Sequence, residues 1–258
     1  MSYLAREVRA AWVATSFLTR LPVPPSTHHL QAGDLQRATS WFPLVGALVG
    51  LATAGLTWLL HPHLPFGIAL LVALLVEARL TGAFHEDAVA DAFDAFGGGF
   101  SRERVLEILK DSRIGSYGAL ALFGAFLLRY ESSKALWLVR GELFFAGVVC
   151  AASLGRLSGM LLLAALPTIP ERQSLSRDLV VLPASRVSLA LIATLPALMW
   201  LAWLDRAAAL LAIGACAVVV WIGVRYLRRR LGGSTGDALG TATYAVQLTT
   251  LLAVLWRF

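Results

Sequence analysis

The feature that most constrains this chain is a series of apolar runs, each close to the length of a bilayer-crossing helix. A helix spans the hydrocarbon core in about 20 predominantly apolar residues. Runs of this kind cover residues 41–60, 64–84, 117–139, 143–166, 187–204, 207–224 and 238–256. They predict an all-α, polytopic integral membrane protein with about seven transmembrane helices, in which residues 1–258 form a single membrane-embedded domain.

Composition argues against the other protein classes. Of the 258 residues, 58% are apolar and 15% are charged, and the mean hydropathy is +0.71. A soluble domain carries about a quarter charged residues. Cys150 and Cys216 both lie inside apolar runs, which is typical of small buried side chains rather than of a disulfide framework. The net charge of +6 indicates basic loops on one side of a membrane rather than a nucleic-acid-binding surface.

The distribution of Lys and Arg predicts the orientation of the chain. Basic residues gather before the first apolar run and in the connections at 102–113, 172–186 and 225–230, whereas the connection at 61–63 carries none. With seven spans, all the basic segments fall on one side, which the positive-inside rule assigns to the cytoplasm. We therefore expect a multi-pass protein of the cytoplasmic (inner) membrane. Its N-terminus and its acidic active-site segment face the cytoplasm, and its C-terminus lies on the opposite side.

Three aspartates in the polar segment between the second and third runs form the strongest candidate site. Asp87, Asp91 and Asp94 stand at i, i+4 and i+7, so on a helix they share one face. A solvated acidic face normally carries interleaved Lys or Arg, but none occurs between Arg79 and Arg102. Carboxylates are ligands that Mg²⁺ prefers, commonly together with substrate phosphates. The spacing predicts a Mg²⁺ site formed by the three aspartates.

A second candidate element directly precedes the third apolar run. Lys110, Arg113 and Ser116 stand just before it, where the N-terminus of a helix offers free N–H groups to an anion. Gly115 and Gly118 allow a ligand to approach the backbone closely. The pattern favours a phosphate-binding segment beside the aspartates. The alternative is a juxtamembrane basic anchor with a serine helix cap.

Four ionisable residues lie inside or at the edges of apolar runs, where charge is costly and often functional. They are Glu77, Arg79, Glu142 and Arg156. Glu77 and Arg79 are two residues apart and cannot face each other on one helix. Arg156 is equally suited to a substrate contact and to a link between helices.

The general base cannot be chosen from the sequence. Asp94 belongs to the acidic segment, and His85 precedes it in the chain. Asp237 lies in a glycine-rich loop that opens the last apolar run on the predicted cytoplasmic side. A lone His at a boundary is more often a structural hydrogen-bonding residue, and Asp237 is also suited to the first turn of a helix. All three remain candidates.

Taken together, these segments resemble the cobalamin (5′-phosphate) synthase family, also called adenosylcobinamide-GDP ribazoletransferases. The similarity covers most of the chain and rests on residues 17–24 (FLTRLPVP), 41–46 (WFPLVG), 81–94, 110–118 (KDSRIGSYG) and 235–240 (TGDALG). The chain departs from the family pattern at Ala83, Ala88 and Ala95, where glycine is usual. It departs again at Tyr244 and Gln247, where acidic residues are frequent.

The resemblance implies the assembly of the cobalamin nucleotide loop. A hydroxyl of α-ribazole, or of its 5′-phosphate, would attack the phosphorus attached to cobinamide in adenosylcobinamide-GDP, and GMP would leave. Mg²⁺ is the implied cofactor, with membrane lipid as surroundings and no nucleic acid as partner. Homo-oligomers and complexes with other cobalamin-biosynthesis enzymes stay open. The candidate substrate-binding residues are Lys110, Ser112, Arg113, Gly115 and Ser116 in the 110–118 motif, together with Arg156 from its place inside an apolar run.

Two other classes compete with this interpretation. One is another aspartate-rich membrane transferase, acting on prenyl diphosphates or CDP-alcohols. A prenyltransferase is expected to carry a second aspartate-rich motif, and a CDP-alcohol enzyme an Ala-Arg pair and a second spaced pair of aspartates after the first aspartates. Neither feature follows Asp94 in this chain. The other class is a transporter, which predicts inverted repeats and interrupted helices in both halves. No internal repeat is visible in the sequence.

Overall fold

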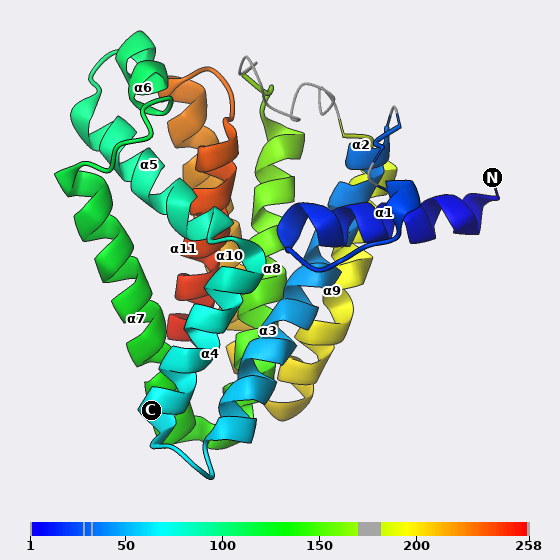
Figure 1. The fold of residues 1–258 in the computed structure, drawn as a ribbon, viewed down its shortest axis with the longest axis vertical. Coiled ribbons are helices and arrows are strands. Elements are labelled where there is room, and N and C mark those ends of the chain that lie inside the picture. Colours follow the sequence, from blue (N-terminus) through cyan, green and yellow to red (C-terminus); the bar gives the residue numbers. More distant parts are fainter. Residues whose placement is uncertain (1, 28, 32, 170–181, 257–258) are drawn as a thin grey trace.

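A computed structural model describes residues 2–27, 29–31, 33–169 and 182–256, and these residues are almost entirely helical (Figure 1). Over this part of the chain no strand forms, and the only extended pairing is an isolated bridge between Thr168 and Ser234. The expectation of an all-α fold is confirmed.

The body of the protein is a bundle of long helices that run in alternating directions (Figure 1). α8 occupies its centre, is buried along most of its length, and packs most extensively against α3 and α11. The bundle helices are α3 (Phe42–Leu60), α4 (Phe66–Thr81), α7 (Ser116–Arg140), α8 (Phe144–Ala165), α9 (Ala184–Leu204), α10 (Arg206–Arg230) and α11 (Gly236–Leu255).

By length and hydropathy, five helical stretches of the described residues are able to cross a membrane, or six if α4 and α5 (Phe84–Gly98) count as one broken span. One of the five, residues 116–165, contains both α7 and α8. These two helices are joined by a short 3-10 turn, η3 (Gly141–Leu143), and run in opposite directions (Figure 1). The membrane-protein class is confirmed, and the count of seven spans stays a prediction.

The second apolar run, expected to continue to Phe84, ends earlier as a helix because the chain turns sharply. α4 stops at Thr81, and Gly82 closes it with a left-handed φ of +72°. Ala83 also has a positive φ, +56°, which is uncommon for a residue with a side chain. α5 then leaves at 84° to α4 and crosses the end of the bundle. α5 therefore enters the count of spans only if it is joined to α4 as one broken span.

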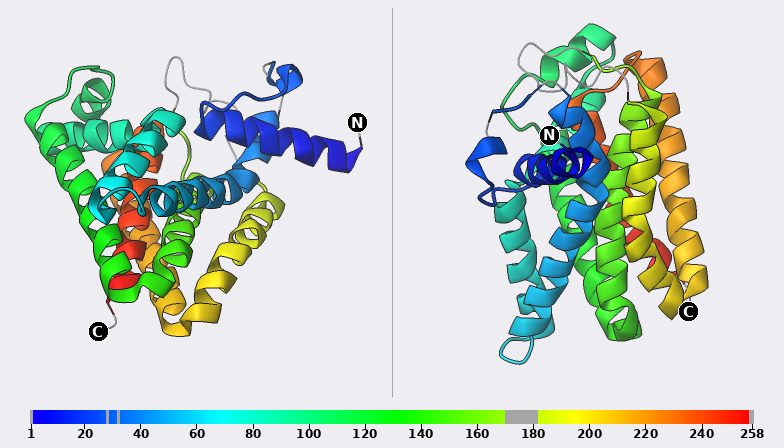
Figure 2. Two further views of the ribbon diagram at one scale, coloured as in Figure 1. Left: turned by 60° about the horizontal axis from the view of Figure 1, so that its bottom comes forward. Right: turned by 90° about the vertical axis from the view of Figure 1, so that its right-hand side faces the viewer.

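Further helices gather at the same end as α5, which we call the α5 end (Figures 1 and 2). They are α1 (Tyr3–Leu18), η1 (Pro25–Thr27), α2 (Asp34–Ala38), η2 (Thr39–Trp41) and α6 (Arg102–Ile108). α1 projects sideways from the bundle (Figure 2) and is tied to it by an ion pair between Glu7 and Arg186 at 2.8 Å. The two chain ends lie at opposite ends of the bundle, as the predicted topology requires.

Candidate active site

The three aspartates lie on one helix face at the α5 end, as predicted. α5 is rich in alanine, the best helix former, and ends in the glycines at 97–99. Asp87 is exposed, and Asp91 and Asp94 are half-buried. Burial and the negative charges of Asp87 and Asp94 raise the pKa of Asp91 to about 6. This acidic face therefore carries negative charge that its own residues do not neutralise.

Asp94 is held by the beginning of α7. Its carboxylate accepts hydrogen bonds from the backbone N–H groups of Gly115, at 2.6 Å, and Gly118, at 2.8 Å. A Cβ at Gly118 would clash with Asp94 and would lie 2.7 Å from the carbonyl oxygen of Ala90. The two glycines thus allow close approach to the backbone, where the sequence analysis expected a ligand to approach. The group that approaches in this structure is the carboxylate of Asp94.

This arrangement bears on the expected Mg²⁺ site. Both carboxylate oxygens of Asp94 accept amide hydrogen bonds. Across the described ranges no three His, Cys, Asp or Glu side chains are placed to share one ion. Asp87 and Asp91 form no ion pair with any described residue, and Mg²⁺ is often bound by one or two carboxylates together with substrate phosphates and water. Asp87 and Asp91 fit such an ion, whereas the Asp94 carboxylate is already hydrogen-bonded to the beginning of α7.

The segment between α6 and α7 carries the predicted phosphate-binding residues. Lys110, Ser112 and Ser116 are exposed. The guanidinium of Arg113 contacts the carboxylate of Asp111 at 2.6 Å, and this contact lowers the pKa of Asp111 to about 2. The Arg113 side chain is 87% exposed, so this ion pair is open to exchange with another anion.

The alternative of a serine helix cap does not hold for α7. The N-cap residue is Gly115, and Ser116 is the first helical residue. The amides at this helix end are instead satisfied by Asp94, which comes from a different helix. Asp94 therefore joins the acidic helix α5 to the segment that carries Lys110 and Arg113.

His85 is not part of the acidic face. It precedes Asp94 by nine residues, and a period of 3.6 places such positions on opposite sides of a helix. Its side chain points into the bundle, and the residue is 4% exposed. The structure thus separates His85 from the three aspartates.

Asp237 lies in the first turn of α11, which begins after Thr235. The hydroxyl of Thr235 accepts a hydrogen bond from the N–H of Ala238 and caps the helix. Three and four residues after Asp237, Gly240 and Thr241 pack on α5. The Thr241 hydroxyl donates to the carbonyl of Ala88 at 2.7 Å, and a Cβ at Gly240 would lie 2.5 Å from the Ala88 Cβ. Residues at this spacing share a helix face, so Asp237 lies on the side of α11 that meets α5.

A buried polar cluster below α5 was missed by the sequence reasoning. The guanidinium of Arg129 contacts Glu77 at 2.6 Å and lies 3.8 Å from the carboxylate of Glu86. Thr53 donates a hydrogen bond to Glu77, and the Arg129 guanidinium stands 5.8 Å from the ring centroid of Tyr244. Glu77 was identified as a costly charge. The available signal for the cluster was Arg129, a charged residue that interrupts the apolar run 117–139 and pairs with Glu77.

Arg156 lies deep in the bundle on α8. It donates a hydrogen bond to the side chain of Gln247 on α11 at 3.3 Å and another to the carbonyl of Ala152 at 3.4 Å. Gly46 on α3 leaves room for this side chain, because a Cβ there would lie 2.8 Å from the Arg156 Cδ. Of the two sequence interpretations, the contacts observed are those of a link between helices.

An apolar cavity of about 460 Å³ lies beneath α5. On α5 it is lined by residues 92, 93, 96 and 97, which lie away from the face that carries Asp87 and Asp91. The side chains of Tyr117 and Tyr226 contribute further aromatic lining. The cavity is thus separate from the acidic face.

Comparison with known proteins places the chain among relatives that match along nearly its whole length. A family model described as Cobalamin-5-phosphate synthase matches residues 10–255. A protein of Ralstonia nicotianae named adenosylcobinamide-GDP ribazoletransferase is 38% identical over 99% of this chain and 98% of its own length. Proteins of the same name from Shewanella baltica and Shewanella amazonensis are 36% and 37% identical, over 97% and 99% of this chain and 95% and 98% of their own lengths. No solved structure matches. The chain therefore belongs to the cobalamin-5-phosphate synthase family.

Proposed function

We propose that this protein is an adenosylcobinamide-GDP ribazoletransferase. It joins adenosylcobinamide-GDP to α-ribazole, or to α-ribazole 5′-phosphate, and releases GMP. The observation that carries the proposal is the acidic face of α5 joined through Asp94 to the Lys110–Arg113 segment, in a chain that matches the family over residues 10–255.

The reaction is a displacement at phosphorus. The ribazole hydroxyl oxygen forms a bond to the phosphorus attached to cobinamide, the bond from that phosphorus to the bridging oxygen of the diphosphate breaks, and GMP leaves with that oxygen. The hydroxyl proton passes to a base. Such a displacement needs positive charge around the phosphoryl oxygens and a nucleophile held in line with the leaving group.

Asp87 and Asp91 are the residues that would hold Mg²⁺. Bound Mg²⁺ neutralises charge on phosphoryl and leaving-group oxygens and orients the substrate. The exposure of Asp87 at the α5 end and the raised pKa of the half-buried Asp91 support this assignment. Asp94, expected from the sequence as a third ligand, is assigned a positioning role, because its carboxylate fixes the beginning of α7.

The cationic part of the site comes from the segment before α7. We assign phosphate binding to Lys110 and Arg113, with Ser112, Ser116 and the backbone of Gly115 close by in the chain. Arg113 exchanges the exposed carboxylate of Asp111 for a substrate phosphate, to which a guanidinium can donate two parallel hydrogen bonds.

For the general base we favour Asp237. His85 is buried on the opposite side of α5, and Asp94 already accepts two amide hydrogen bonds. Asp237 lies on the face of α11 that packs against α5. Arg156 is assigned to helix packing rather than to substrate contact, because it bonds to Gln247 and to its own helix.

We place the protein in the cytoplasmic (inner) membrane with its α5 end in the cytoplasm. Basic residues at 102–113 and 225–230 lie at this end, which supports the positive-inside assignment. Residues 172–181 of the third basic segment lie outside the described residues. Exposed apolar side chains along α9 and α10, such as Met199, Trp203 and Ile222, support contact with lipid.

Turnover by the purified protein in lipid vesicles tests the proposal. The protein is supplied with adenosylcobinamide-GDP, α-ribazole and Mg²⁺, and both products are quantified. We expect GMP and adenosylcobalamin in equal amounts. No GMP from folded protein, or GMP without a corrinoid product, contradicts the proposal. CDP-alcohols and prenyl diphosphates are run in parallel, because turnover of either instead supports the competing transferase class.

A further inference from the structure

Residues 17–24 stand far from the aspartates in sequence, and no role has been assigned to them so far. The structure places them against the elbow between α4 and α5. The backbone N–H of Arg20 donates to the carbonyl of Leu80 at 2.7 Å. The ring of Phe17 packs edge-on against Phe84, the first residue of α5, with centroids 5.7 Å apart, and stacks on Phe42 at 5.4 Å. These contacts fix the backbone at Arg20 beside the start of the acidic helix.

The absence of a side chain at Gly82, in the turn between α4 and α5, leaves room for the guanidinium of Arg20. A Cβ at Gly82 would lie 2.7 Å from the Arg20 Nε and 3.0 Å from its Nη2. Gly82 also has a φ of +72°, which favours glycine independently. The Arg20 guanidinium thus lies directly over the turn from which α5 begins, and Asp87 stands in the first turn of that helix.

Arg20 has no counter-ion in the part of the chain that the structure describes. Its side chain is exposed and forms neither an ion pair nor a hydrogen bond with a described residue. Two other arginines of the α5 end are paired, Arg9 with Asp34 at 2.8 Å and Arg186 with Glu7 at 2.8 Å. A guanidinium held at its backbone, unpaired, and placed beside an acidic face is suited to an anion that reaches this face.

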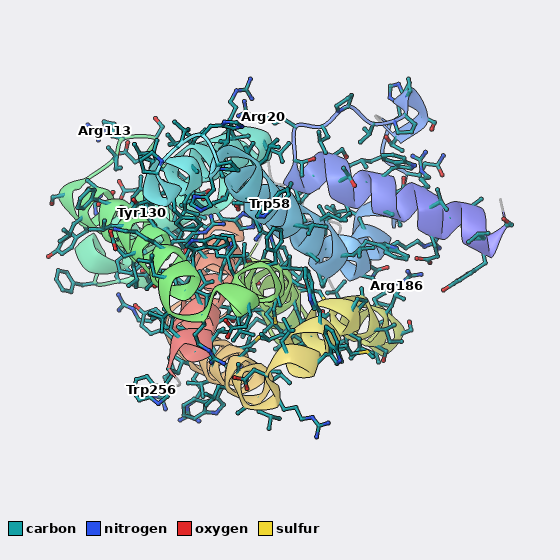
Figure 3. The ribbon with its side chains drawn as sticks, turned by 90° about the horizontal axis from the view of Figure 1, so that it is seen from below. Arg20, Trp58, Arg113, Tyr130, Arg186 and Trp256 are labelled. Atoms are coloured by element: carbon teal, nitrogen blue, oxygen red, sulfur yellow. The ribbon has the colours of Figure 1, made fainter. Side chains whose placement is uncertain are left out.

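Arg20 and Arg113 lie on the same side of the bundle when the protein is viewed from below (Figure 3). Arg20 stands at the Asp87 end of α5, and the segment with Arg113 stands at the Asp94 end, where Gly115 contacts Asp94. A helix of this length is about 22 Å long. The acidic face therefore has a separate cationic group at each end.

We propose that Arg20 binds a phosphate group of a substrate at the Asp87 end of the acidic face. The inference rests on the proposed function and adds a substrate-binding residue to it. Two phosphate groups have this chemistry, the diphosphate of adenosylcobinamide-GDP and the 5′-phosphate of α-ribazole 5′-phosphate. Arg20 acts as a bidentate donor to one of them.

The test compares Arg20→Met and Arg20→Lys with the matched control Arg6→Met. Arg6 is an exposed arginine near the N-terminal end of α1, the helix that ends two residues before Arg20, and its side chain has no ion pair among the described residues. We expect Arg20→Met to raise the KM of one phosphate-bearing substrate about tenfold or more with a smaller change in kcat. Arg20→Lys restores part of the loss, since it keeps the charge but loses the fork. Arg6→Met keeps wild-type constants.

Two co-substrates separate the two phosphate sources. With α-ribazole as acceptor, a raised KM for adenosylcobinamide-GDP assigns Arg20 to the diphosphate. A raised KM for α-ribazole 5′-phosphate, with α-ribazole unaffected, assigns it to the 5′-phosphate. Wild-type KM values for every phosphate-bearing substrate in Arg20→Met overturn the inference.

A binding measurement keeps the inference separate from the proposed function. Inorganic diphosphate with Mg²⁺ is titrated into wild type and into the Arg20→Met variant, and this requires no turnover. An inactive wild type contradicts the proposed function alone. Binding that weakens about tenfold in Arg20→Met but not in Arg6→Met supports the inference. Equal binding by wild type and Arg20→Met, together with unchanged KM values where turnover occurs, contradicts it.

Discussion

Glu77 and Arg129 form an ion pair inside the bundle, with the Glu77 Oε2 and the Arg129 Nη2 2.6 Å apart and both side chains 3% exposed. The other terminal nitrogen of Arg129 is 3.8 Å from Glu86 on α5. Arg129 therefore contacts both arms of the elbow, α4 through Glu77 and α5 through Glu86. A buried charged cluster that links α4 and α5 thus lies directly below the helix that carries the aspartates.

Arg129→Met is expected to destabilise the protein by about 3–5 kcal/mol, because it leaves the buried carboxylate of Glu77 without its ion-pair partner. Lys134→Met is the matched control. Lys134 lies on the same helix in an exposed pair with Glu131 at 3.5 Å, and its loss should cost about 1 kcal/mol or less. Unfolding of both variants in detergent or lipid measures the difference. Equal destabilisation of the two variants would show that the buried ion pair contributes no more to stability than the exposed one.

Gly118→Ala should lower turnover while the protein stays inserted. The added methyl group meets Asp94 and the carbonyl of Ala90, so the carboxylate loses its place on the beginning of α7. Gly124→Ala on the same helix has no atom within 4 Å of the new Cβ and serves as control. Steady-state kinetics on both variants checks the prediction. If the two variants turn over alike, the Asp94 contact does not matter for the reaction.

Arg113→Lys should raise the KM of adenosylcobinamide-GDP several-fold, since a lysine cannot replace a bidentate fork. The control is Arg104→Lys on α6, where Arg104 forms an exposed pair with Glu107 at 2.7 Å. Kinetics of the two variants under identical conditions decides the point. Wild-type constants for Arg113→Lys would leave Arg113 as a membrane anchor.

Topology gives an independent prediction. A reporter inserted near Gly233, in the connection that precedes α11, should be cytoplasmic, and one fused at Phe258 should be extracytoplasmic. This follows from the basic residues at the α5 end and from the position of the chain ends at opposite ends of the bundle. Reporter activity in cells measures both sites. If both reporters lie on the same side, α11 does not cross the membrane once between them, and the predicted topology is wrong.

Much of the fold follows from local sequence. The apolar runs correspond to the bundle helices, and the spacing of Asp87, Asp91 and Asp94 placed them correctly on one helix face. The end of α4 was predicted three residues late, because Phe84 continues the apolar run although Gly82 turns the chain. Hydropathy alone does not register such a turn.

The contacts that organise the site could not be predicted from local patterns. Asp94 reaches the amides of Gly115 and Gly118 across more than 20 residues, and Arg129 finds Glu77 across 52. Both depend on how helices pack, which a single sequence does not specify. The separation of His85 from the aspartates could have been predicted from the sequence, because helical periodicity already places His85 opposite Asp94.

We propose that the acidic face of α5 supports a Mg²⁺-dependent phosphoryl transfer. The most direct measurement is GMP release as a function of free Mg²⁺ by wild type, Asp87→Asn and Asp91→Asn, with Glu103→Gln on α6 as an exposed control. We expect chelation to abolish GMP release. We also expect the rate of release to fall at least about 100-fold in each aspartate variant but not in Glu103→Gln. Release that persists without Mg²⁺, or wild-type rates in both aspartate variants, would contradict this proposal.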